Sequence, residues 1–184
     1  MEIKSTPISG LFEITPKVYP DQRGWFYELY KEAAFSEIAD SVKFLQENLS
    51  FSKKGVLRGL HLQLDPFRQA KLVTVITGKV LDVVVDLRPG SKTFGQVHKC
   101  LLDGSSHKSL FVPEGFAHGF STLEDTHFYY KCSSLYNPKY ETGIRWDDPQ
   151  LKIDWQVSDP ILSDKDKLLP TLEELLIKSV ISPR

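Results

Sequence analysis

The chain is dominated by short runs of β-branched and aromatic residues that recur roughly every ten residues, with turn residues between them. This spacing leaves little room for the helical crossovers of a βαβ fold and favours an antiparallel sandwich or barrel. The pair Gly78-Lys79 separates two valine-rich runs and predicts a tight hairpin, while Arg88 to Ser91 and Asp103-Gly104 predict further turns. We predict strands at 12–18, 25–30, 42–46, 56–63, 71–77, 80–87, 96–102, 109–112 and 127–135.

Helical patterns are restricted to two short segments. Residues 32–40 can form one helix near the N-terminus, and residues 171–180 follow Pro170 with leucines at helical spacing. The sequence shows no internal repeat and no linker that would divide its 184 residues. We therefore predict a single all-β domain, 1–184, with short N-terminal and C-terminal helices.

Composition limits the function classes. A formal net charge of -1 gives no electrostatic basis for binding nucleic acid. No apolar run approaches the roughly 18 residues of a membrane span, and charges interrupt the first residues where a secretory signal would be apolar. We expect a cytoplasmic protein. Cys100 and Cys132 lack metal or redox spacing and are expected to fill the core, although a disulfide between them stays open.

The run from Gly55 to Gln63 places charge-capable side chains in a strand that otherwise looks buried. Leu60 and Leu62 alternate with His61 and Gln63, the period of a strand with two different faces. A lone histidine there would most simply be a hydrogen-bonded core residue. A second histidine, His118, lies in Pro113-Glu114-Gly115-Phe116-Ala117-His118, whereas His98 and His107 stand among polar residues and are predicted at the surface.

The pattern Pro-x-Gly-x-x-His around His118 resembles the second motif of the cupin superfamily, whose fold is a double-stranded β-helix (jelly-roll) barrel. Metal-binding cupins carry His-x-His in their first motif, but this chain has His61-Leu62-Gln63. Two histidines and an amide make a poor site for a divalent metal. The resemblance thus implies a cupin-like barrel without a metal or cofactor, suited to acid–base chemistry.

Further motifs, in order along most of the chain, resemble the dTDP-4-dehydrorhamnose 3,5-epimerase family. The segments that carry the resemblance are Asp21–Glu28, Gln46–Asn48, Val56–His61, Lys71–Val73, Pro113–Phe120, Tyr130-Lys131 and Leu162–Asp166. The resemblance implies a dTDP-sugar substrate whose C4 ketone acidifies the protons on C3 and C5, a product that enters dTDP-L-rhamnose synthesis for cell-surface polysaccharide, and no cofactor.

Four residues match the catalytic positions of that family. His61 matches the base, and imidazoles titrate near neutral pH. Asp166 matches its carboxylate partner, which would fix the tautomer. Lys71 matches a position that meets the enolate oxygen, and Tyr130 matches the general acid; a strand shifted by one residue would present Tyr129 instead.

The resemblance also implies binding residues. Arg23 and Arg58 match contacts to the nucleotide, where guanidinium groups pair with phosphate. In that family the segment of Arg23 and Glu28 reaches the neighbouring subunit, so a homodimer is implied. This chain departs from relatives that often carry two consecutive tyrosines, because it has Leu135-Tyr136 there, which weakens the expected aromatic stack on thymine. Tyr136 and Phe26 remain as the residues expected to supply that stack. The remaining matches to substrate contacts are Gln46, Asn48, His118, Glu141 and Lys165.

Strand parity adds one hypothesis and leaves alternatives open. Asp82 and Asp86 share a strand face that we take to point into the barrel, where Asp82 would orient His118. An epimerase acting on C3 or C5 alone, or on another nucleotide sugar, would fit the same motifs. A metal-dependent cupin using His61, Gln63 and His118, and a nucleotide-sugar binding module without catalysis, are less favoured alternatives.

Overall fold

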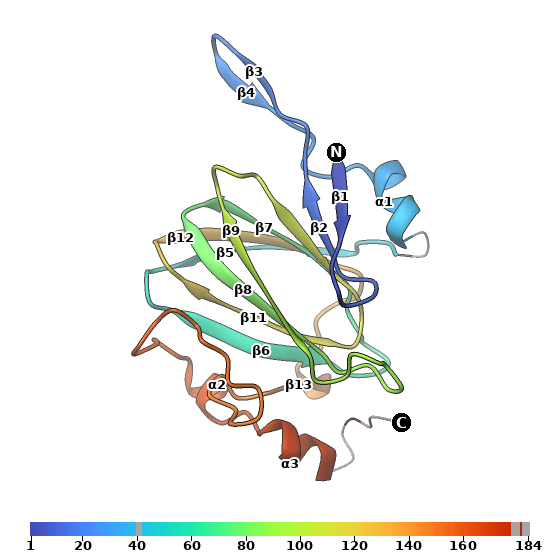
Figure 1. The fold of residues 1–184 in the computed structure, drawn as a ribbon, viewed down its shortest axis with the longest axis vertical. Coiled ribbons are helices and arrows are strands. Elements are labelled where there is room, and N and C mark those ends of the chain that lie inside the picture. Colours follow the sequence, from blue (N-terminus) through green and yellow to red (C-terminus); the bar gives the residue numbers. More distant parts are fainter. Residues whose placement is uncertain (40–41, 178–180, 182–184) are drawn as a thin grey trace.

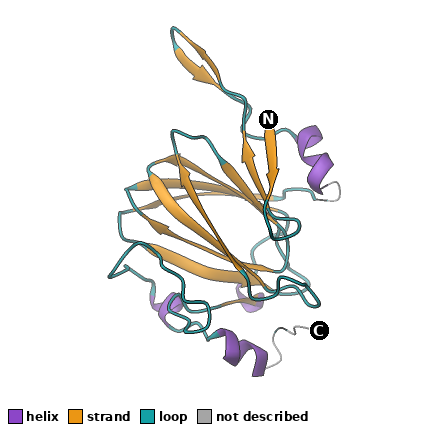
Figure 2. Cartoon of the chain, in the orientation of Figure 1, coloured by secondary structure: helices purple, strands orange, loops and turns teal. Residues whose placement is uncertain are grey.

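A computed structural model describes residues 1–39, 42–177 and 181, and antiparallel strands make up most of it (Figure 1, Figure 2). One sheet has six strands in the order β1-β2-β10-β7-β12-β5, a second has five in the order β13-β6-β11-β8-β9, and β3 and β4 form a separate hairpin. The strands are β1 Glu2–Ser5, β2 Phe12–Thr15, β3 Tyr19–Asp21, β4 Gly24–Phe26, β5 Gln46–Ser52, β6 Leu57–Gln63, β7 Lys71–Thr77, β8 Lys79–Asp86, β9 Val97–Asp103, β10 Ser109–Val112, β11 Phe116–Thr122, β12 Thr126–Cys132 and β13 Glu141–Gly143.

The helices are short and lie outside the sheets (Figure 2). They are α1 Glu32–Ala39, α2 Asp164–Lys167, α3 Leu172–Ile177 and a 3-10 turn at Pro138–Tyr140. The expected N-terminal and C-terminal helices are therefore confirmed; Asp40 and residues 178–180 of those predictions lie outside the described residues. The described helices are all too short and insufficiently apolar to cross a membrane. The fold is the all-β, cupin-like barrel that the sequence predicts.

The predicted hairpin at Gly78-Lys79 is wrong. The strands on its two sides, β7 and β8, belong to different sheets, so the chain turns a corner between sheets at Gly78. Gly78 has φ +84°, and a Cβ there would lie 2.2 Å from the carbonyl oxygen of Asp125. Only glycine fits this crossing, and a glycine between two β-runs predicts a corner as readily as a hairpin turn.

Several predicted strand limits also need correction. The strand predicted at 42–46 runs instead from Gln46 to Ser52, and the one predicted at 25–30 is reduced to Gly24–Phe26. The strand predicted at 127–135 ends at Cys132. Strand β11, Phe116–Thr122, was not predicted, because its glycine and small residues weaken the β-pattern.

The core lies on both faces of the second sheet. Between the sheets, Val73 and Val75 of β7 pack with Val80 and Val84 of β8. On the outer face, the C-terminal segment covers the sheet with Trp155, Leu172 and Leu175, among others. Strand β8 is thus buried on both sides, which explains its continuous run of valines.

The structure also tests the predictions made for both cysteines and for two of the histidines. Cys100 and Cys132 are free and buried, so the disulfide alternative is excluded in this structure. The surface prediction for His107 is wrong: its ring is buried against Trp25 and Tyr27, with centroid distances of 4.4 and 4.6 Å. His98 is half-buried and lies 3.4 Å from a carboxylate oxygen of Glu13.

Candidate active site

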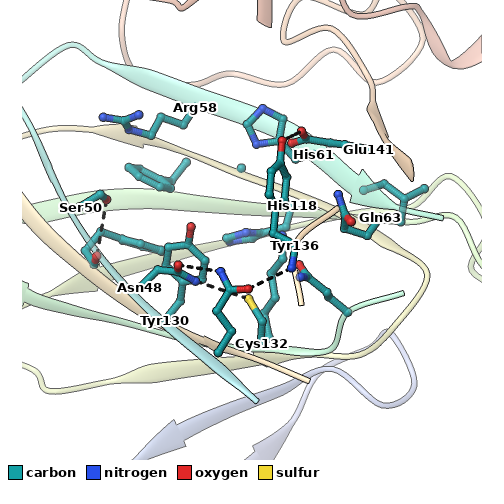
Figure 3. A pocket seen from close by; sticks show the side chains of 17 residues that line it. Asn48, Ser50, Arg58, His61, Gln63, His118, Tyr130, Cys132, Tyr136 and Glu141 are labelled. Atoms are coloured by element: carbon teal, nitrogen blue, oxygen red, sulfur yellow. Dashed lines mark hydrogen bonds between the residues drawn. The ribbon is translucent and has the colours of Figure 1, made fainter. Parts of the chain in front are cut away.

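A cavity of about 360 Å³ opens between the two sheets and is lined by side chains from both (Figure 3). It is the place where most of the predicted site residues meet. Its lining consists of Gln46, Asn48, Ser50, Arg58, His61, Leu62, Gln63, Gln69, Lys71, His118, Gly119, Phe120, Phe128, Tyr130, Cys132, Tyr136 and Glu141.

His61 lies on β6 and is held by a buried carboxylate. Its Nε2 lies 2.6 Å from Oδ1 of Asp166, which comes from helix α2 in the C-terminal segment. Burial alone would raise the pKa of Asp166, but the hydrogen bond and charge of His61 together with the hydroxyl of Ser163 hold that pKa below its usual value. An ionised carboxylate can only accept, so Nε2 donates and Nδ1 keeps the lone pair of the neutral ring. This is the arrangement of an oriented base.

A bulge in β6 brings Arg58 to the same cavity as His61. The register with β11 pairs His118 with His61 but Phe120 with Arg58, which inserts one residue on β6. Gly59 makes the bulge possible, since a Cβ there would lie 2.6 Å from the Cα of Gly119. Arg58 donates from Nε to Ser52 at 2.9 Å and remains largely exposed. A regular strand would have turned Arg58 to the opposite face.

Lys71 begins β7 and points inward with Val73 and Val75, which fill the core on the same face. Burial lowers the pKa of its ammonium group, while nearby Cys132, Glu141 and Asp82 oppose that shift. Among the residues that the structure describes, no carboxylate lies within ion-pair distance of Lys71. Its amino group is therefore free of an ion-pair partner within the described residues and can contact a ligand.

Tyr130, and not its neighbour Tyr129, faces the cavity. Burial raises the pKa of the Tyr130 phenol, and Cys132 and Glu141 add to the effect while Arg58 opposes it. The phenol therefore stays protonated at neutral pH and can donate. Tyr129 lies on the other strand face and donates to Glu47 at 2.9 Å.

His118 forms a second imidazole–carboxylate pair. Its Nε2 lies 2.9 Å from Oδ2 and 3.1 Å from Oδ1 of Asp82, and both side chains are buried. The parity hypothesis for Asp82 is thus confirmed as a contact. Asp86, on the same strand, bonds Arg88, Ser91 and Thr93 at the strand end and does not line the cavity.

Strand β5 supplies two of the amide side chains of the cavity, Gln46 and Asn48. Gln46 donates to Asn48 at 2.9 Å and accepts from the backbone N–H of Tyr136 at 2.9 Å. Asn48 in turn donates weakly to Cys132 at 3.8 Å. These bonds fix the wall of β5 against β12 and against the loop that carries Tyr136.

An acidic corner closes one end of the cavity. Glu141 accepts from Tyr136 at 2.6 Å and from Lys165. Burial raises the pKa of Glu141, but these two bonds and the charge of His61 outweigh it, so the net shift is downward. Lys165 also lies 5.9 Å from the ring centre of Tyr136. Figure 3 shows Glu141, Tyr136 and Gln63 at the end away from Arg58 and Ser50.

Three predicted residues lie away from this cavity. Arg23, Phe26 and Glu28 belong to or follow the β3–β4 hairpin, which extends well beyond the sheets (Figure 1). The Arg23 side chain is 90% exposed and pairs with Asp21, and Glu28 pairs with Lys31 at 3.3 Å. Within one chain these residues do not join the site.

Sequence reasoning missed part of the lining. Ser50 shares a face of β5 with Gln46 and Asn48, and Phe128 and Cys132 share a face of β12 with Tyr130. Counting by two along either strand from a recognised residue would have found them. Counting by two along β11 from His118 would likewise have found Phe120, whereas Gln69 lies in a loop, where strand parity does not apply.

One polar side-chain atom of each of His61, His118 and Gln63, the residues of the metal-dependent alternative, is already engaged within the protein. Nε2 of His61 and Nε2 of His118 both face carboxylates, and Oε1 of Gln63 accepts from a backbone N–H. Within residues 1–39, 42–177 and 181, the group of potential metal ligands whose atoms converge within 4.8 Å is Glu13, His98 and Cys100, outside the cavity. Glu13 there already pairs with Lys108 at 3.1 Å.

Comparisons with known proteins agree on one family. The family model described as dTDP-4-dehydrorhamnose 3,5-epimerase matches residues 5–174. The dTDP-4-dehydrorhamnose 3,5-epimerase of Methanothermobacter thermautotrophicus is 47% identical over 92% of this chain and 93% of that protein. The solved structure of the RmlC epimerase of Mycobacterium tuberculosis aligns with a TM-score of 0.93 and 41% identity, covering 99% of this chain and 94% of that one. NovW of Streptomyces spheroides, a 4-keto-6-deoxy sugar epimerase, aligns with a TM-score of 0.95 and 38% identity, covering 99% and 92%. This chain belongs to the dTDP-4-dehydrorhamnose 3,5-epimerase family.

Proposed function

We propose that this protein epimerises dTDP-4-dehydro-6-deoxy-D-glucose at C3 and C5 to give dTDP-4-dehydro-L-rhamnose. The observation that carries the proposal is one cavity lined by a carboxylate-backed imidazole, a buried ammonium and a protonated phenol. We take the whole chain as one epimerase domain, placed in the cytoplasm in the pathway to dTDP-L-rhamnose and cell-surface polysaccharide.

The chemistry is proton transfer next to a ketone. Nδ1 of His61 removes the proton from C3 or C5, and the electron pair moves into an enolate at C4. Asp166 stabilises the imidazolium that forms. Lys71 meets the enolate oxygen, where one well-placed donor is worth roughly 3–4 kcal/mol. Tyr130 returns a proton to the opposite face of the carbon, which inverts it, and no cofactor takes part.

The nucleotide would extend from the sugar along the polar walls. Arg58 is the exposed guanidinium at the cavity and is suited to the diphosphate. Gln46, Asn48 and His118 line the path, and the ring of Tyr136 offers a stacking surface for thymine beside Glu141 and Lys165.

A homodimer would bring the remaining predicted binding residues to the cavity. The β3–β4 hairpin carries exposed aromatic side chains of Tyr19, Trp25 and Phe26, and strand β5 at the sheet edge exposes Leu49 and Phe51. Exposed apolar side chains on a projecting arm favour packing against another copy. We propose that this arm places Arg23, Phe26 and Glu28 at the partner's cavity.

The test is NMR of the keto-sugar substrate in deuterated buffer with the purified protein. Deuterium should enter both C3 and C5, and His61→Ala should remove both exchanges. Normal exchange in that variant would eliminate His61 as the base. Activity that survives complete chelation excludes the metal-dependent alternative, and binding without exchange in the wild type would favour the binding module.

The second candidate is epimerisation of one centre only, or of a related nucleotide sugar. It is supported by the likeness to ChmJ of Streptomyces bikiniensis, a 3'-monoepimerase whose structure aligns with a TM-score of 0.89 and 32% identity, covering 96% of this chain and 91% of that one. The same spectra separate the two candidates, because exchange at C3 and C5 is observed at different resonances.

A further inference from the structure

Gln63 lies inside the cavity but has no part in the proton chemistry proposed above. It is the last residue of β6, on the same strand face as His61, and it is 5% exposed. Figure 3 shows it at the end of the cavity that also holds Tyr136 and Glu141. A buried amide in this place needs hydrogen-bond partners for both its oxygen and its nitrogen.

The orientation of the amide is fixed by one bond. Oε1 accepts from the backbone N–H of Asn137 at 3.1 Å. A backbone N–H can only donate, so the atom facing it must be the oxygen and not the NH₂ group. The NH₂ group of Gln63 therefore points away from the Asn137 loop.

The nitrogen is left without a partner. Among the residues that the structure describes, Nε2 of Gln63 is buried and has no hydrogen-bond acceptor. The carboxylate of Glu141, the register partner of Gln63 on β13, is engaged with Tyr136 and Lys165. A buried donor left unpaired costs about 1–3 kcal/mol, so an occupant of the cavity that supplies an acceptor would gain from meeting it.

We infer that Nε2 of Gln63 donates a hydrogen bond to an uncharged oxygen, a hydroxyl or a carbonyl, of the bound nucleotide sugar. The identity of the ligand rests on the proposed function. A neutral amide suits a neutral oxygen, whereas the diphosphate is better matched by the guanidinium of Arg58. Gln63 is then a binding residue whose hydrogen bond holds the ligand in position beside the catalytic base.

Two substitutions distinguish the role of the Gln63 NH₂ group, the proposed donor to the ligand, from that of Oε1, which accepts from the N–H of Asn137. Gln63→Glu keeps an oxygen for the N–H of Asn137 but replaces the donor, and Gln63→Met removes both at similar length. We expect both variants to raise KM for the keto-sugar roughly three- to tenfold, the range of one lost hydrogen bond, with kcat changed less. Gln150→Glu, the same change at an exposed glutamine, is the control and should leave KM unaltered.

The outcomes are distinct. An unchanged KM in both variants overturns the inference, and so does a rise in Gln63→Glu alone, which would report only the added negative charge. A rise in Gln63→Met alone would assign the effect to the Asn137 loop and also overturn it. Calorimetric titration with dTDP locates the acceptor: equally weakened dTDP binding places it on the nucleotide, and unchanged dTDP binding places it on the sugar. A wild-type protein that neither binds dTDP nor exchanges substrate protons would instead remove the proposed function.

Discussion

Two imidazole–carboxylate pairs face each other across neighbouring strands of one sheet. His61 of β6 and His118 of β11 are register partners, and each bonds a carboxylate through Nε2, at 2.6 Å to Asp166 and 2.9 Å to Asp82. Their surroundings differ: the side chain of His61 is 28% exposed and that of His118 is 7% exposed.

The difference shows that the pair alone does not define a base. A general base must reach the proton that it removes, and the more open ring of His61 leaves Nδ1 free to approach a ligand. His118 is enclosed and held by Asp82 from the adjacent strand β8, so it forms a fixed part of the wall. The Asp166 partner comes instead from helix α2, far along the chain.

The largest effect is expected at His61. His61→Asn removes the base while keeping a polar side chain, and exchange at C3 and C5 should fall at least about 10³-fold, within the range for loss of a general base. His118→Asn, the matched change in the other pair, should cost much less in kcat. Single-turnover exchange followed by NMR measures both. Equal losses in the two variants would mean that both rings act on substrate protons.

The next effect is at the carboxylate behind the base. Asp166→Asn retains the shape of the side chain but can donate to the ring and stabilise the wrong tautomer. We expect kcat to fall about 10²-fold, the lower end of the range for general acid–base catalysis. Because the pKa of Asp166 is held below its usual value, this carboxylate stays ionised at neutral and weakly acidic pH. Loss of activity at weakly acidic pH should therefore not come from protonation of Asp166. An Asp166→Asn protein with wild-type kcat would remove the carboxylate from the mechanism.

Only some contacts of the two imidazole–carboxylate pairs could be predicted from the sequence. Period-two counting on β8 predicted that Asp82 meets His118, because parity survives along a regular strand. It could not place Arg58 beside His61, because the bulge at Gly59 shifts the face of the strand. Nor could it show the pairing of Asp166 with His61, which are brought together by the packing of the C-terminal segment and were matched only through the family motif.

Prediction of the fold from the sequence was limited in the same way. The local pattern of β-branched and aromatic residues predicted most strands, and those at Lys71–Thr77 and Ser109–Val112 have the predicted bounds. The corner at Gly78 was mistaken for a hairpin, since the chain direction there depends on contact with Asp125, a residue distant in sequence. Local propensity fixes an element, but tertiary contacts decide which sheet it joins.

A third buried carboxylate, Asp86, differs from Asp82 and Asp166 because its charged partner is Arg88, which stays protonated at all relevant pH values, and not a histidine. Burial would raise the pKa of Asp86, but bonds from Arg88, Ser91 and Thr93 lower it to about 2. Against the ordinary aspartate pKa of 3.8, this lowering is worth about 2 kcal/mol of folding free energy, present above the unfolded pKa and lost as pH falls towards 2. We therefore expect the wild type to lose its stability advantage over Asp86→Asn at low pH. The difference in their free energies of unfolding in urea should be about 2 kcal/mol smaller near pH 2 than at pH 7. A constant difference across that pH range would contradict this account.

The smallest effect on turnover is expected at Asp82. Asp82→Asn can still hydrogen-bond His118 but loses the charge, so the ring should be less firmly oriented and kcat/KM should fall roughly three- to tenfold. Because Asp82 and Asp166 are both buried, either change should also lower the melting temperature, and the larger loss of kcat in Asp166→Asn should distinguish the two variants. Parallel measurement of melting and exchange in the two variants checks both halves of the comparison. Undiminished turnover in Asp82→Asn would show that His118 needs no orienting partner, and the two pairs would then differ in kind and not merely in exposure.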